Sequence, residues 1–138
     1  MDKVVRVDNE IYAILVKSDS VKDGSEWFGD QHESLQAQRM KYPAGSKFRV
    51  HQHILNPRTI KRTQEAFVVI SGWIEVDVYA TNGELIGVLE AGPGDAVFVY
   101  RGGHGVHIAQ DAIVYEIKAG SFTYTSEDKQ FIDGRGQE

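Results

Sequence analysis

Short apolar segments separated by turn residues run through most of this chain of 138 residues. The clearest turn is Asn82-Gly83, which lies between the alternating segments 73–79 and 85–89. Asn-Gly favours a two-residue hairpin turn because both central residues must adopt positive φ. Turn residues recur at intervals of roughly 8–12 residues, and no long segment has the period of a helix. This pattern predicts an all-β protein, built as a sandwich or a barrel.

The same pattern predicts a single domain, because 138 residues are enough for one buried core. The polar stretch Ser18–Glu33 is predicted to be a loop, and Ser71-Gly72 a tight hairpin turn. Residues 126–138 are polar and charged, which is typical of a mobile tail. We expect strands at Val4–Val7, Ile11–Val16, Leu35–Tyr42, Phe48–Leu55, Glu65–Ile70, Trp73–Tyr79, Leu85–Leu89, Ala96–Tyr100 and Ala112–Lys118.

Composition narrows the classes of partner. The net charge of −5 argues against general binding to nucleic acid or to an anionic membrane surface. The longest apolar run, Ile11–Val16, is too short to span a bilayer. The chain has no cysteine, which excludes disulfides and thiolate chemistry and fits a cytoplasmic location. We therefore expect a cytoplasmic protein with a small-molecule ligand, and neither nucleic acid nor a membrane as its partner.

Two histidines, His51 and His53, stand one residue apart in an apolar segment. Side chains alternate between the two faces of a strand, so a strand here would place both imidazoles on one side. A carboxylate, Glu65, and a third imidazole, His104, follow in other β segments. Three imidazoles and one carboxylate are sufficient for a mononuclear metal site.

The spacing of these residues resembles the two sequence motifs of the cupin superfamily. The matching residues are Gly45, His51, His53, Glu65 and Gly72 in the first motif, and Gly94, Gly102 and His104 in the second. Eleven residues separate His53 from Glu65, more than in the family's motif, so residues 54–64 are expected to form a longer excursion. Tyr100 and Ile108 replace a proline and an asparagine of the second motif. The resemblance covers about residues 35–120 and implies a double-stranded β-helix, or jelly-roll barrel, preceded by N-terminal strands in residues 4–16.

A closer likeness is to small single-domain cupins that often accompany polysaccharide or nucleotide-sugar biosynthesis. The shared stretches here are Arg39–Gly45, Thr63–Glu65 and Gly102–Gly105. Carried over to this sequence, the resemblance implies one divalent metal ion, which could be zinc, manganese, iron or nickel. The implied ligands are His51, His53, Glu65 and His104, with Gln64 as the alternative to Glu65.

Charged residues near these ligands are candidates for substrate binding. Arg49 would share the strand face of the paired histidines and could bind a carboxylate or phosphate, or it could be a solvated strand-end cation. Glu116 and Lys118 alternate in the last strand, and either line the pocket, as the resemblance suggests, or face solvent. His107 is expected to face away from His104 as a surface histidine. His32 lies in a polar loop and is assigned no role.

Several functions fit this sequence. The first is a metal-binding cupin enzyme, isomerase-like or epimerase-like, acting on a small polar metabolite such as a sugar or sugar phosphate. The second is a metal-free isomerase or epimerase of a nucleotide-linked keto-sugar, with a histidine as general base. A non-catalytic binding or regulatory module and an iron-dependent dioxygenase are further alternatives. No single residue is assigned as catalytic. A homodimer is expected, with residues 4–16 covering a sheet edge.

Overall fold

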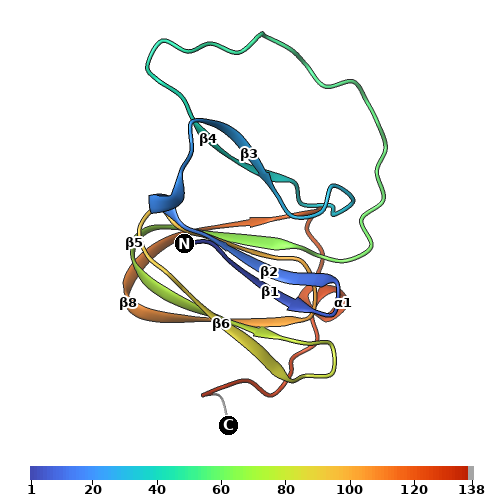
Figure 1. Ribbon diagram of the computed structural model, residues 1–138. Helices are drawn as coiled ribbons and strands as arrows, with labels where there is room; N and C mark the ends of the chain where they lie inside the picture. Colours follow the sequence, from blue (N-terminus) through green and yellow to red (C-terminus); the bar gives the residue numbers. More distant parts are fainter. Residues whose placement is uncertain (137–138) are drawn as a thin grey trace.

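The computed structural model describes residues 1–136 and is built almost entirely from antiparallel strands (Figure 1). Its elements are β1 (Lys3–Val7), β2 (Glu10–Val16), a 3-10 turn (Ser18–Ser20), β3 (Gly24–Phe28), β4 (Ala37–Lys41), β5 (Glu65–Tyr79), β6 (Leu85–Ala91), β7 (Ala96–Val99), β8 (Gly103–Lys118) and α1 (Thr125–Asp128). The predicted all-β class is confirmed. Within residues 1–136, no helix has both the length and the apolar character needed to cross a membrane.

Two long strands, β5 and β8, organise the main sheet. They pair with each other along nearly their whole length, from Glu65 opposite Lys118 to Tyr79 opposite Gly103. On its other side, the first part of β5 pairs with β7 and the second part pairs with β6. The sheet continues from β7 to β2 and then β1. Figure 1 shows the resulting curved sheet, which brings strands distant in sequence around one core.

The apolar core lies on the inner side of this sheet. Leu15, Val97 and Phe67 are neighbours across β2, β7 and β5, and all three are buried. The branched and aromatic residues predicted for these strands therefore pack against one another, which is the main source of stability for such a sheet. The apolar runs in residues 11–16 and 96–99 correctly predicted β2 and β7.

A second, smaller cluster lies on the outer side, where the β3–β4 hairpin covers the sheet. Phe28 of this hairpin stacks on Phe98 of β7, with the ring centroids 6.1 Å apart. Ile14, Val16 and Tyr100 complete the buried part of the cluster. The prediction of a loop over Ser18–Glu33 was therefore wrong for Gly24–Phe28. Ser25 and Trp27 of this strand are exposed, whereas Phe28 gains a partner from elsewhere in the chain.

The predicted hairpin turn at Ser71-Gly72 is also wrong, because β5 runs unbroken through these residues. The pairing of β5 with β8 changes register between Val69 and Ile74, which marks a bulge. Gly72 has φ +78°, and a Cβ there would lie 2.0 Å from the carbonyl oxygen of Asp111. A bulge and a hairpin both require such a glycine, so this local signal was compatible with either. A hairpin is confirmed between β5 and β6, but its connection spans Ala80–Glu84 and has positive φ at Gly83 and not at Asn82, so the two-residue form of the turn was wrong.

The segment between β4 and β5 forms no strand, so the strand predicted at Phe48–Leu55 is wrong. Figure 1 shows this segment arching away from the sheets. Its apolar side chains are exposed, and Leu55 is 101% exposed. A strand is stable only when a neighbouring strand takes up its hydrogen bonds, and this segment pairs with none in residues 1–136.

The C-terminal segment after β8 lies against the sheet. Its short helix α1 is followed by irregular chain, and Arg135 binds Asp77 of β5. Residues 137–138 of the predicted mobile tail lie outside the described residues. At the other end of the chain, β1 pairs only with β2 within residues 1–136. A second copy of the chain at that edge stays a prediction.

Candidate functional site

A carboxylate and an imidazole meet at one end of the sheet. Glu65 begins β5 and is 5% exposed, and its Oε2 lies 2.8 Å from Nε2 of His104 on β8. The two residues are far apart along the β5–β8 ladder, and the curvature of the sheet brings them together. The ring of His104 also contacts that of Phe67, at a centroid distance of 5.7 Å. The pair therefore combines a buried anion with a half-buried ring.

Hydrogen bonding controls the charge of Glu65. The bond from His104 lowers the pKa of Glu65, whereas burial opposes this effect. The positive charge of Lys129 lowers this pKa further. Glu65 is therefore a carboxylate at neutral pH, able to accept a hydrogen bond or to bind a cation.

A cavity of about 830 Å³ opens in front of this pair. Glu65, His104 and His107 line it from the sheet, and the segment 127–135 forms much of the opposite wall. Within residues 1–136, it is larger than the second cavity beside Tyr100, which measures about 440 Å³. Its volume lies within the range of about 300–1,000 Å³ that is usual for small-molecule sites.

The other two implied metal ligands lie outside this cavity. His51 and His53 belong to the exposed segment between β4 and β5, with their ring centroids 5.3 Å apart. Nδ1 of His51 lies 3.0 Å from the carbonyl oxygen of Arg49 in the same segment. Among the described residues, no three His, Asp or Glu side chains gather as a metal site. The four implied ligands therefore form two separate pairs in the described part of the chain.

Gln64 and Glu65 point to opposite sides of β5. Gln64 is 1% exposed, and its Oε1 accepts a hydrogen bond from the backbone N–H of Leu35 at 2.7 Å. Its Nε2 donates to the carbonyl oxygen of Tyr100 at 3.3 Å and to the carboxylate of Glu33. These contacts tie the chain before β4 to the end of β7. Of the two alternatives, only Glu65 lines the large cavity.

The three residues predicted to bind substrate have different surroundings. Arg49 lies in the exposed segment between β4 and β5. Glu116 of β8 pairs with Phe67 of β5, two residues along the strand from Glu65. Nζ of Lys118 lies 3.4 Å from a carboxylate oxygen of Asp128. Within residues 1–136, none of the three lines the large cavity.

A buried charged network beside the cavity was not predicted. Asp77 of β5 is 0% exposed, and its Oδ2 lies 2.9 Å from Nε2 of His107. Arg135 donates to both carboxylate oxygens of Asp77, and Tyr79 accepts a hydrogen bond from the backbone N–H of Arg135. Burial raises the pKa of Asp77, but the hydrogen bonds from Arg135 and His107 outweigh burial and lower it overall. His107 is therefore a partner of a buried carboxylate, which corrects its prediction as a surface histidine.

A signal for this network was present in the sequence. Asp77 stands in the middle of the predicted strand Trp73–Tyr79, and a carboxylate that is buried in a strand requires a partner. The sequence does not say which cation supplies it. The partner Arg135 comes from the C-terminal segment, 58 residues away.

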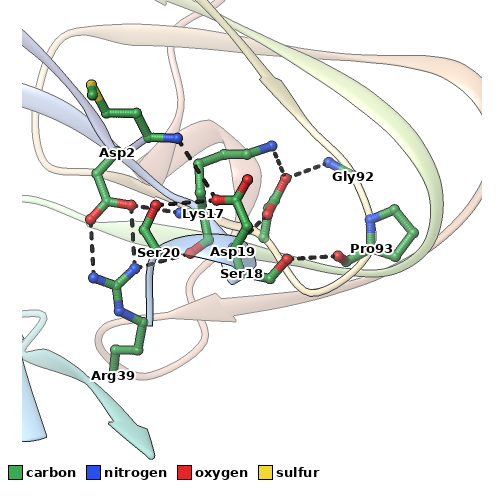
Figure 2. A network of polar contacts seen from close by, with 10 residues as sticks. Asp2, Lys17, Ser18, Asp19, Ser20, Arg39, Gly92 and Pro93 are labelled. Atoms are coloured by element: carbon green, nitrogen blue, oxygen red, sulfur yellow. Dashed lines mark hydrogen bonds and ion pairs between the residues drawn. The ribbon is translucent and has the colours of Figure 1, made fainter. Parts of the chain in front are cut away.

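A second network fixes the start of β7, the strand that leads toward His104 (Figure 2). Asp95 accepts hydrogen bonds from the backbone N–H groups of Ser18 and Gly92, and its Oδ2 lies 2.5 Å from Nζ of Lys17. Arg39 joins the network through Asp2 and the carbonyl oxygen of Lys17. Arg39 is therefore engaged in holding β2 and β4 together.

Comparisons with models of protein families, with curated proteins and with solved structures found no match to this chain. A function for the chain must therefore be inferred from its own residues. The most informative are Glu65 and His104, because the structure brings them together in a cavity of suitable size.

Proposed function

We propose that this protein is a metal-binding cupin that acts on a small polar metabolite such as a sugar or sugar phosphate. The main support for this proposal is the Glu65–His104 pair. It places one oxygen and one nitrogen atom that can bind a metal side by side in the large cavity. Oxygen and imidazole donors suit zinc, manganese, iron and nickel. The histidine and glutamate motifs, with their resemblance to small cupins of polysaccharide biosynthesis, support the same proposal.

The complete ligand set requires His51 and His53 to reach this pair. Eleven residues lie between His53 and Glu65, and an extended chain covers about 3.3–3.6 Å per residue, so the segment is long enough to return to the cavity. The long strand β8 pairs only with β5 in residues 1–136, so its other edge has unpaired backbone groups. We infer that the segment around Phe48–Leu55 pairs with this edge when the metal binds, as a barrel-closing strand. The metal would then polarise a carbonyl or hydroxyl group of the substrate.

A metal-free isomerase or epimerase is the second candidate, and the same pair favours it. A carboxylate that binds an imidazole holds the ring in one orientation and stabilises its protonated form. His104 would take a proton from the carbon beside a keto group, and the imidazolium would return it at a different position or face. Glu65 would stabilise the transient imidazolium. This chemistry requires neither His51 nor His53.

Elemental analysis of tag-free protein, purified without chelator or added metal, distinguishes the two candidates. The metal-binding proposal expects close to one iron, manganese, nickel or zinc per chain, with most of it lost in His51→Ala and in His104→Ala. The exposed loop residue His32 provides the matched control, so His32→Ala should retain the metal. His107→Ala should also retain it, because His107 binds Asp77. Equal metal content in all four variants would refute the ligand assignment.

Hydrogen exchange tests the proposed movement of the segment. Backbone amides in 48–55 should exchange freely in metal-free protein and become protected after saturation with the metal found by elemental analysis. The amides of Gly103–Gln110 on the edge of β8 should gain protection at the same time. If the protein stays metal-free after incubation with each metal, His104→Ala should instead abolish any turnover of a nucleotide-linked keto-sugar, whereas His51→Ala should not.

A further inference from the structure

Three positively charged side chains stand at the rim of the large cavity. Lys61 and Arg62 come from the chain just before β5, and Lys129 follows α1. All three line the cavity that contains Glu65 and His104. Within residues 1–136, none of the three forms an ion pair with a carboxylate, whereas Arg135 on the same wall is engaged by Asp77 and Glu75. The rim therefore presents three cations with free donors.

A hydrogen bond holds the two cationic segments side by side. Oγ1 of Thr63 donates to Oδ1 of Asp128 at 2.6 Å, which joins the chain before β5 to α1. The other carboxylate oxygen of Asp128 faces Lys118 at 3.4 Å. Thr63 stands next to Arg62, and Asp128 next to Lys129. The contact therefore fixes the cations on one rim, while Lys118 offsets the charge of Asp128.

The charge of this rim is opposite to that of the whole protein. The chain carries a net charge of −5, but the three rim cations form no ion pair within residues 1–136. Three acids line the cavity in that range. Glu65 faces His104, and Asp128 contacts Thr63 and Lys118, so Glu127 is the one lining acid there without such a contact. A local positive potential at the mouth of a cavity attracts anions and raises their local concentration. An arginine also matches the geometry of a phosphate or carboxylate with two parallel hydrogen bonds.

We propose that Lys61, Arg62 and Lys129 bind the oxyanion group, phosphate or carboxylate, of a sugar-sized ligand whose other end reaches Glu65 and His104. This inference rests on the proposed function and specifies its substrate class. It assigns anion binding to these three cavity residues in place of Arg49 and Lys118, the candidates from the sequence. Arg49 stands away from the cavity, and Lys118 is engaged by Asp128.

The test measures the binding of three hexose probes by titration calorimetry: glucose 6-phosphate, glucuronate and glucose. The full-length chain is first treated with a chelator, so that direct contact between an anion and a metal cannot contribute. The rim variant combines Lys61→Gln, Arg62→Gln and Lys129→Gln. The matched control combines Lys22→Gln, Lys47→Gln and Arg58→Gln, which remove the same charge from exposed residues outside the cavity.

The unaltered protein should bind at least one of the two anionic sugars more tightly than glucose. An exposed ion pair changes affinity by about two- to fivefold, so the rim variant should lose about tenfold or more, and the control less than about twofold. Preference for glucose 6-phosphate would identify phosphate as the recognised group, and preference for glucuronate would identify carboxylate. Glucose binding as tightly as both anions, equal losses in the two variants, or no binding of any probe at millimolar concentration would each overturn the inference.

Metal content separates this result from the proposed function. The rim variant should retain the metal of the unaltered protein, since none of its three residues is an implied ligand. If the rim variant keeps its metal and binds the anionic sugars as tightly as the unaltered protein does, the rim site is refuted and the metal site is not. Loss of metal only in His51→Ala and His104→Ala would meanwhile support the metal site independently.

Discussion

The buried carboxylate of Asp95 offers the sharpest test of how the site is supported. Asp95 is 2% exposed and accepts three hydrogen bonds, from Lys17 and from the backbone N–H groups of Ser18 and Gly92. These contacts join the end of β2 to the turn before β7 (Figure 2). We expect Asp95→Ala to loosen this junction and to destabilise the whole sheet, because β7 lies between β2 and β5.

The size of this effect follows from which groups lose their partner. The N–H of Gly92 is buried, and a buried donor without an acceptor costs about 1–3 kcal/mol. Lys17 is 21% exposed and the N–H of Ser18 is only partly buried, so both groups can reach water and add less. The free energy of unfolding should therefore fall by about 2–4 kcal/mol in Asp95→Ala. Asp95→Asn keeps one acceptor oxygen and should lose roughly half as much.

The effect should also depend on pH in a defined direction. Burial raises the pKa of Asp95, but the hydrogen bonds from Lys17, Ser18 and Gly92 outweigh burial and lower it overall. A carboxyl whose pKa is lower in the folded state stabilises the protein above its unfolded-state pKa of about 3.9. This stabilisation is lost as the pH falls through the folded-state pKa. The difference between the unaltered protein and Asp95→Ala should be constant from pH 7 to about 5 and shrink below about 3.9.

Urea unfolding followed by tryptophan fluorescence measures these differences, because Trp73 lies beside Lys17. With an m-value of about 2 kcal/mol per molar urea, the midpoint should shift down by about 1–2 M in Asp95→Ala. A shift equivalent to less than about 1 kcal/mol, or a difference that persists unchanged at low pH, would show that Asp95 does not support the junction as an ionised group.

Two further substitutions, one of them with a matched control, test the contacts of β5 and of Gln64, which precedes it. Gly72→Ala should destabilise the protein by more than about 2 kcal/mol, because its Cβ would meet the backbone of Asp111 at 2.0 Å. Gly83→Ala is the control, because Gly83 also has positive φ but its added Cβ would have no atom within 4 Å. It should cost about 1–2 kcal/mol in thermal unfolding. Equal losses of stability in the two variants would contradict the bulge at Gly72. Gln64→Leu should cost about 1–3 kcal/mol by leaving the N–H of Leu35 without its acceptor, and a change below about 0.5 kcal/mol in urea unfolding would argue against that role.

Sequence predicted most of the strands whose signals are local. Strands β2, β6 and β7 and the Asn82-Gly83 hairpin follow from short apolar segments and turn chemistry. The bulge at Gly72 could not be distinguished from a turn, since both need positive φ at a glycine. The strand expected at Phe48–Leu55 failed for another reason. Alternation shows that a segment could be covered on one face, but not that a neighbouring strand pairs with it.

The candidate site was predictable to a similar extent. Motif spacing selected Glu65 and His104, which the fold brings within hydrogen-bond distance. It did not reveal that Asp77 pairs with His107 and Arg135, because that contact joins segments without a shared local pattern. The rim cations Arg62 and Lys129 were likewise hidden, since the contact between their neighbours Thr63 and Asp128 places them on one cavity.

The central position of β5 has a consequence for the order of folding. This strand pairs with β6, β7 and β8, so Glu65–Lys118 contains a nearly self-sufficient set of antiparallel pairings. By contrast, β2 joins β7 through pairs such as Ala13 with Val99, which close a long loop of chain. Because closing long loops slows folding, we expect the β5–β8 region to form first and the N-terminal strands to dock last. During synthesis on a ribosome, β1 and β2 would emerge first and would stay without β7, the strand that pairs with β2, until β7 has emerged as well.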